Sequence, residues 1–146
     1  MMSKKYSNTK FIYAFPGVGK TYFCKNTNIK NFIEISKPTP EPLKGEYLKA
    51  FVDSLVSYDG KVGIVFIEFD INIINKLNKF SDKVTLIYPQ DKLRDEYIER
   101  YKKTQCLEFC NYMHYNWDSL LSEIKSVGYC NHIILASGSY ISDFLG

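Results

Sequence analysis

The most informative stretch of the sequence is a run of eight residues near the N-terminus: Ala14-Phe15-Pro16-Gly17-Val18-Gly19-Lys20-Thr21. They fit the A/G-x4-G-K-S/T form of the phosphate-binding Walker A loop, with alanine in the first position. Gly17 and Gly19 allow such a loop to wrap around a phosphate with its N–H groups pointing inward. Lys20 then reaches the β- and γ-phosphates, and the Thr21 hydroxyl can ligate Mg²⁺. The predicted binding residues for ATP or another nucleoside triphosphate are Pro16, Gly17, Val18, Gly19, Lys20, Thr21 and Tyr22.

The sequence on either side of this loop has the required character. Residues 11–15 form an apolar, aromatic run that predicts a strand, and residues 20–26 predict a helix whose N-terminus faces the anion. The alternative is an ordinary glycine–proline turn in front of a helix. A strand before the loop and a helix after it favour the phosphate-binding interpretation.

Apolar runs and helical patterns alternate along the rest of the chain. We expect strands at residues 11–15, 32–35, 62–69, 84–88 and 133–136, and helices at residues 20–26, 41–58, 71–80, 90–103 and 106–127. Five strands separated by helices predict an α/β fold with a mostly parallel, five-stranded sheet. The strands are apolar on both faces, which indicates helices on both sides of the sheet and hence three layers. We expect one domain over residues 1–146.

The composition excludes several classes of protein. The chain has 146 residues, of which 45% are hydrophobic and 24% charged, so it is not collagen-like, wholly disordered or a long coiled coil. Its apolar runs are shorter than the roughly 20 residues of a membrane span, and residues 1–10 lack the apolar core of a secretory signal. We therefore expect no membrane partner, a cytoplasmic location and cysteines that are free thiols.

The net charge of the chain is small, and its positive charges come mainly from lysine. The net charge is +3, and scattered lysines leave a nucleic-acid partner open without indicating one. Lysine, asparagine, isoleucine and tyrosine are abundant, as an AT-rich coding sequence imposes. This bias hints at a viral genome, in which case the location would be the host cytoplasm.

Arginine occurs only at Arg94 and Arg100, and lysine supplies the rest of the 19 basic residues. On a helical wheel of residues 90–103, both arginines fall with the apolar side chains, at or inside the edge of that face. A guanidinium in such a place needs an anion. One interpretation is a core salt bridge or a side chain that reaches the rim. We favour the other, a phosphate clamp, because the planar guanidinium suits phosphate and the chain uses lysine elsewhere.

Phosphoryl transfer also needs a carboxylate that organises Mg²⁺ or orients the nucleophile. Glu34 ends the second expected strand, and Glu68 and Asp70 end the third. Each has the alternative of a solvent-facing charge, and Asp70 also that of an N-cap for the helix beginning at Ile71. We rank them as catalytic candidates in the order Glu34, Asp70, Glu68. Glu68 or Asp70 is the candidate for binding Mg²⁺ together with Thr21.

Two other patterns are set aside. Cys106, Cys110 and His114 follow a four-residue spacing, but the ends of this stripe lie about 12 Å apart along a helix. One zinc ion cannot reach all three side chains, so we expect the stripe in the core. The segment Asn75-Lys76-Leu77-Asn78 misses the last position of the guanine-reading N-K-x-D motif, which disfavours a Ras-like GTPase.

Three segments together resemble small P-loop nucleoside and nucleotide kinases of phages and large DNA viruses, which are related to adenylate kinases. They are the Pro16–Thr21 loop, Tyr97-Ile98-Glu99-Arg100-Tyr101 and Asn116-Trp117-Asp118. The resemblance implies a P-loop NTPase fold with strand order 2-3-1-4-5. It also implies transfer of the ATP γ-phosphoryl group to a nucleoside or nucleotide. Lys20 and Thr21 would match the loop lysine and the Mg²⁺-linked hydroxyl of that family.

The resemblance extends to two further regions. Arg94 and Arg100 match the arginine-bearing lid, and Ser137 and Gly138, after the last strand, match the region that holds adenine. The sequence Glu34-Ile35-Ser36 stands where these kinases have a D-x-D/S motif, and the D-G-x-P-R run of adenylate kinases is missing after the third strand. The acceptor, which we expect under helix 41–58, is therefore left open.

Two alternatives to a nucleotide kinase remain. A nucleotide-binding regulatory or structural protein without catalysis would fit the substituted acidic motif at Glu34. A polynucleotide 5′-kinase would need a basic groove, for which surface clustering of Lys37, Lys44 and Lys49 would be the sign.

Overall fold

The computed structural model describes residues 9–26 and 31–145. Most of the polar segment 1–10, expected not to be a signal, lies outside these residues. The architecture is α/β with a five-stranded, all-parallel sheet in the order β2-β3-β1-β4-β5, as the resemblance implied. The strands are β1 (Lys10–Ala14), β2 (Phe32–Ile35), β3 (Ile64–Ile67), β4 (Val84–Pro89) and β5 (Asn131–Leu135).

The helices follow the expected order. The α-helices are α1 (Lys20–Asn26), α2 (Gly45–Val56), α3 (Ile71–Lys76), α4 (Arg94–Thr104), α5 (Leu107–Lys125) and α6 (Ser142–Leu145), and the 3₁₀ helices are η1 (Asn78–Lys83) and η2 (Asp91–Leu93). Helix α1 has the expected bounds, whereas α2, α3 and α5 are shorter than expected. The helix expected at 41–58 begins only at Gly45, since Pro38, Pro40 and Pro42 hold the preceding loop extended. The helix expected at 90–103 divides into η2 and α4, and α6 was not predicted.

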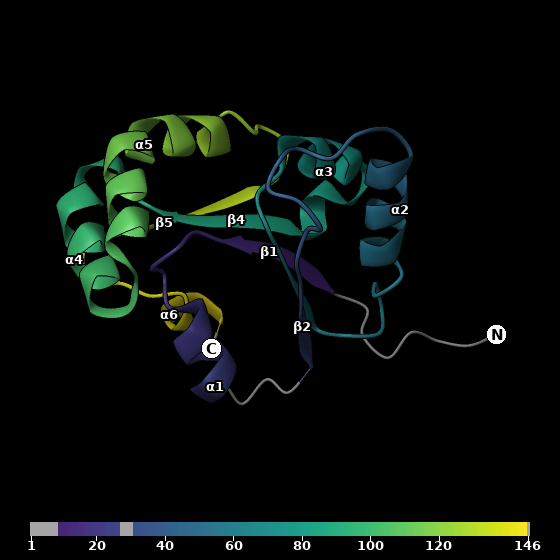
Figure 1. Cartoon of the computed structure of the whole chain (residues 1–146). Helices are drawn as coiled ribbons and strands as arrows, with labels where there is room; N and C mark the ends of the chain where they lie inside the picture. The colour runs from purple at the N-terminus through teal and green to yellow at the C-terminus, as the bar shows by residue number, and fades with distance from the viewer. Residues whose placement is uncertain (1–8, 27–30, 146) are drawn as a thin grey trace. The chain divides into compact units, whose positions relative to one another are not determined.

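The described chain divides into two compact units. The first contains residues 9–14, 31–86 and 129–131, and the second contains residues 15–26, 87–128 and 132–145. Figure 1 shows the course of the chain through these elements. The single domain and the helices on both sides of the sheet stay predictions.

In the first unit, β3 lies between β1 and β2 and pairs with both in parallel. Phe11 of β1 and Ile33 of β2 are both aligned with Val65. All four residues of β3 are buried, as expected for a strand covered on both faces. Thr9 fixes the loop that enters β3, because its hydroxyl donates to the Val62 carbonyl at 2.7 Å and accepts the N–H of Gly60 at 2.7 Å.

In the second unit, an aromatic cluster forms the core beneath α4 and α5. The ring of Trp117 lies 5.4 Å from that of Phe15 and 5.6 Å from that of Tyr97, measured between centroids. The indole N–H donates to the Asp91 carbonyl at 2.8 Å, so this large side chain is buried with its polar group satisfied. Phe15 immediately follows β1, and the cluster thereby anchors the start of the predicted phosphate loop.

The four cysteines are free thiols, as expected. The prediction that Cys106, Cys110 and His114 all belong to the core is wrong for two of them. Only Cys110 is buried, whereas Cys106 and His114 are exposed because the buried stripe of α5 follows Met113, Trp117 and Leu121. Within residues 9–26 and 31–145, no group of His, Cys, Asp and Glu side chains could hold a metal ion by itself. In the same part of the chain, no helix combines the length and apolarity needed to cross a bilayer.

Candidate functional site

The predicted phosphate loop has the backbone of a narrow, glycine-dependent turn. Gly17 and Gly19 adopt φ angles of 91° and 94°, which other residues adopt only at a cost. The N–H of Val18 donates to the Phe15 carbonyl at 3.2 Å, and Phe23 donates to the Gly19 carbonyl at 2.9 Å as α1 begins. The N–H groups of Gly17 and Gly19 make no hydrogen bond with any described residue. They are therefore available to an anion.

Helix α4 holds the carbonyl groups at the start of this loop. The Tyr101 hydroxyl donates to the Pro16 carbonyl at 2.7 Å, and Arg100 Nη1 donates to the Gly17 carbonyl at 2.7 Å. A Cβ atom on Gly17 would lie 2.9 Å from ring carbons of both Tyr97 and Tyr101. Close contact and positive φ thus both require glycine at position 17.

Arg100 is enclosed, as its place on the apolar face of the helix predicted. Its side chain is 15% exposed, and its guanidinium lies 4.2 Å from the ring centres of both Tyr97 and Tyr140. Its Nη2 donates to Glu96 at 3.0 Å and to the Ser139 carbonyl at 3.5 Å. The anion that this arginine needs is therefore Glu96, which is the salt-bridge alternative. A phosphate-clamp role for Arg100 stays a prediction, and the observed contacts make it a tie that positions the loop.

Arg94 differs sharply from Arg100. Its side chain is 42% exposed, and its Nε lies 3.9 Å from the Asp95 carboxylate. That Nε atom is buried but makes no hydrogen bond with the described residues. Arg94 therefore lies at the edge of the buried face, and it retains the hydrogen-bonding capacity that Arg100 has already used.

The loop after β5, predicted to hold adenine, is bonded to α4, the helix that also holds the phosphate loop. The Glu96 carboxylate accepts hydrogen bonds from the Ser137 hydroxyl and, at 3.0 Å, from the Gly138 N–H. These two donors, with the Arg100 guanidinium, keep the pKa of Glu96 below its usual range. Glu96 therefore remains ionised at neutral pH and connects α4 to residues 137–139.

The C-terminal segment also contacts the phosphate loop directly. The Ile141 N–H donates to the Val18 carbonyl at 2.8 Å. The ring of Tyr140 lies so near Gly19 that a Cβ atom there would be 3.0 Å from ring carbon Cδ1. The loop is thus held by α4 through Pro16 and Gly17 and by the C-terminal segment through Val18 and Gly19.

A buried tyrosine, Tyr97, lies beside this network. The Tyr97 hydroxyl is buried and makes no hydrogen bond with the described residues. Burial raises the pKa of Tyr97 to about 12, although the nearby Arg100 guanidinium opposes the shift. Tyr97 therefore acts here as a neutral aromatic surface between Gly17 and Arg100.

The three candidate carboxylates belong to the first unit. Glu34 and Glu68 are exposed, at the end of β2 and just after β3. Asp70 is 3% exposed, and one of its oxygens accepts the N–H groups of Asn72 at 2.9 Å and Ile73 at 3.2 Å. Asp70 is thus the N-cap of α3, which is the alternative that the sequence offered.

The second Asp70 oxygen is occupied as well. It accepts the Leu43 N–H at 2.9 Å and lies 3.0 Å from the Lys37 ammonium, in an ion pair whose side chains are 4% and 0% exposed. Burial alone would raise the pKa of Asp70, but the bonds from Leu43, Lys37 and Ile73 lower it overall. Catalysis or Mg²⁺ binding by Asp70 would require these bonds to be exchanged, and both roles stay predictions.

Sequence reasoning missed three residues that hold the site together. Glu96 received no role from the sequence, although its spacing of four residues from Arg100 is typical of an ion pair. Tyr101 received no hydrogen-bonding role. Tyr140 carried no local signal, because its ring contacts Arg100 and Gly19, which are 40 and 121 positions away along the chain.

Comparison with known proteins gives no function for this site. The chain matches no model of a known protein family and no curated protein. The chemistry of the loop and its supports must therefore carry the functional argument.

Proposed function

We propose that the chain binds ATP or another nucleoside triphosphate with Mg²⁺ and transfers the γ-phosphoryl group to a nucleoside or nucleotide, as a P-loop kinase. One observation carries the proposal. Two glycines at positive φ, directly in front of Lys20 and Thr21, have N–H groups that bond to no described residue. Such N–H groups in a glycine-rich turn followed by lysine and threonine provide the donors, the cation and the hydroxyl that a Mg²⁺-bound triphosphate needs.

Each residue would then have a distinct task. Lys20 would bind the β- and γ-phosphates, and the exposed Thr21 hydroxyl would ligate Mg²⁺. Arg94 would neutralise charge on the transferring group, whereas Arg100 would act through Gly17 as a positioning residue. Neutralisation by preorganised cations accounts for most of the catalysis that a protein supplies to phosphoryl transfer.

The base and the acceptor would be bound by other segments. Ser137 and Gly138 would border the base, and Tyr22, which is 65% exposed, would border the triphosphate. Glu34 remains the first candidate for orienting the acceptor, because Asp70 already serves as a cap and ion-pair partner. Glu68 follows as a candidate for Mg²⁺.

A regulatory nucleotide-binding protein is the second candidate function. The observation in its favour is that Asp70, the most buried of the three candidate carboxylates, is already used in a structural ion pair. The polynucleotide 5′-kinase loses support, because Lys37 is enclosed in an ion pair instead of joining Lys44 and Lys49 in a surface cluster.

The test combines binding with transfer. Calorimetry with ATP·Mg²⁺ should show binding, and γ-labelled ATP incubated with a panel of nucleosides and monophosphates should yield a labelled product. Lys20→Ala should weaken binding roughly 10-fold or more, since bonds to charged groups contribute about 1.5–3 kcal/mol. Lys25→Ala, an exposed lysine in the last turn of α1, is the matched control and should leave binding unchanged.

The outcomes separate the candidates. Labelled product that is lost in Lys20→Ala supports the kinase. Binding that Lys20→Ala weakens, with no transfer to any acceptor, favours the regulatory protein and overturns the kinase. Absence of binding overturns both proposals.

A further inference from the structure

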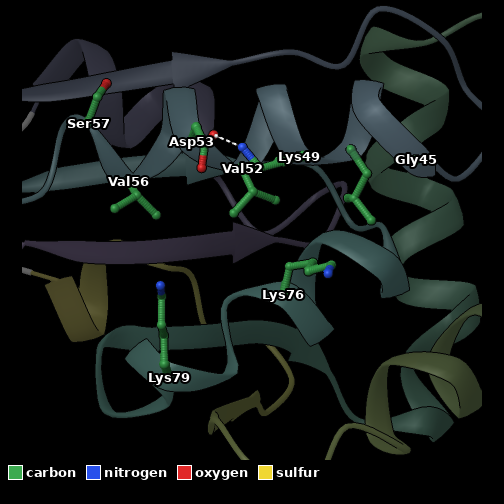
Figure 2. Close-up of a pocket in the computed structure, with 9 residues that line it drawn as sticks. Gly45, Lys49, Val52, Asp53, Val56, Ser57, Lys76 and Lys79 are labelled. Atoms are coloured by element: carbon green, nitrogen blue, oxygen red, sulfur yellow. Dashed lines mark hydrogen bonds and ion pairs between the residues drawn. The ribbon is translucent and has the colours of Figure 1, made fainter.

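A cavity of about 540 Å³ lies in the first unit along α2, the helix under which the acceptor was expected. Figure 2 shows it, lined by α2 on one side and by Lys76 and Lys79 from α3 and η1 on the other. Its volume is within the range of pockets that hold small molecules.

One wall of this cavity is aliphatic. Leu48, Val52 and Val56 follow one another at four-residue spacing along α2, so they share one face of the helix. Leu48 and Val52 are each 8% exposed, and the side chains of Val52 and Val56 point toward the side where Lys76 and Lys79 stand (Figure 2). No aromatic ring lines the cavity among the described residues. This wall suits a hydrocarbon chain better than a nucleobase, which prefers aromatic stacking.

The rim of the cavity is positively charged. Lys49, Lys76 and Lys79 contribute three ammonium groups, against the single carboxylate of Asp53. Asp53 lies 3.5 Å from Lys49, and both side chains are exposed. Among the described residues, neither Lys76 nor Lys79 has a carboxylate partner; the Lys79 ammonium lies only over the ring of Phe80, 5.5 Å from its centre. Two cations therefore remain for an external anion.

We propose that this cavity binds a medium-chain aliphatic carboxylate, with its chain along Leu48, Val52 and Val56 and its carboxylate between Lys76 and Lys79. The apolar wall supplies affinity through burial of methylene groups. The two unpartnered lysines fix the direction of the chain, because only its charged end gains from them. The proposal does not rest on the proposed kinase activity, because carboxylate binding is measured without any nucleotide.

The test is a titration of the ¹⁵N-labelled full chain with octanoate and decanoate as monomers, followed by amide chemical shifts. The shifts should saturate and concentrate on residues 45–57 and on Lys76 and Lys79. Each buried methylene should tighten binding about fourfold, so decanoate should bind roughly 15-fold more tightly than octanoate. Decanol, which has the same chain without the charge, should bind more weakly than decanoate.

Variants test the cationic rim without altering the core. The double variant Lys76→Gln/Lys79→Gln should bind decanoate several-fold more weakly, because an exposed ion pair changes affinity by up to about fivefold. Lys103→Gln, an exposed lysine of α4 outside the cavity, is the control and should bind like the unmodified chain. Equal affinity for octanoate and decanoate, unchanged binding by the double variant, or binding only to anionic lipid vesicles would overturn the proposal.

Discussion

Replacing Gly17 with alanine should destabilise the protein by about 2–6 kcal/mol. The φ of 91° at this position costs a residue with a Cβ atom about 1–3 kcal/mol. The new methyl group would also lie 2.9 Å from ring carbons of Tyr97 and Tyr101, and overpacking of this kind costs about 1–3 kcal/mol more. The two tyrosines cannot withdraw freely, because Tyr101 is bonded to the Pro16 carbonyl and Arg100 stacks on Tyr97.

The two contributions can be separated by a matched variant. Gly138 has a φ of 76°, but nothing lies within 4 Å of a Cβ atom built there, so Gly138→Ala should show the conformational cost alone. The assay is urea unfolding of both variants and the unmodified chain, compared at constant m-value. Gly17→Ala should lose at least 1 kcal/mol more than Gly138→Ala. Equal losses would refute the argument that α4 packs against the loop as described.

Three further changes probe the supports of the site. Asp70→Asn should cost about 3–5 kcal/mol in urea unfolding at pH 7, because Lys37 would be left buried without its partner. Since the pKa of Asp70 is lowered by folding, this difference should be full above about pH 4 and vanish as the pH falls through the lowered value. Tyr101→Phe should cost about 1 kcal/mol, because the Pro16 carbonyl loses its hydrogen bond; an unchanged unfolding midpoint would contradict this bond. Glu96→Gln should accelerate amide hydrogen exchange of Gly138, because the N–H of Gly138 donates to the Glu96 carboxylate. Unchanged exchange would show that this contact is absent in solution.

The order and type of the elements were predictable because they depend on local patterns. Loop 14–21 and the apolar runs at 32–35 and 84–88 each carry their signal within a few residues. The start of α2 was placed too early, because Pro42 within the expected helix and Pro38 and Pro40 before it keep the chain extended up to Lys44. Hydrophobic periodicity does not predict the short η1 and α6, because these elements depend on contacts with other parts of the chain.

The candidate site could be predicted only in part, because its loop motif is a local pattern but its supporting contacts are not. The spacing alone assigned Lys20 to phosphate and Thr21 to Mg²⁺, which stays a prediction, whereas it gave no partner for Arg100. Arg100 bonds to Gly17 across 83 positions, and such a contact leaves no local trace in one sequence. For Asp70 the sequence offered the role of N-cap, which its local bonds to Asn72 and Ile73 confirm, but it gave no sign of the ion pair with Lys37, 33 residues earlier.

The chain contains a single tryptophan, and its burial between Phe15 and Tyr97 makes it a natural fluorescent reporter. Its emission depends on the polarity and packing around the indole, which here means the residues that begin the phosphate loop. A ligand that rearranges this loop can therefore be followed without any attached dye. The same emission monitors the second unit, so its thermal transition can be compared with that of the backbone circular dichroism to reveal whether the chain unfolds in one step.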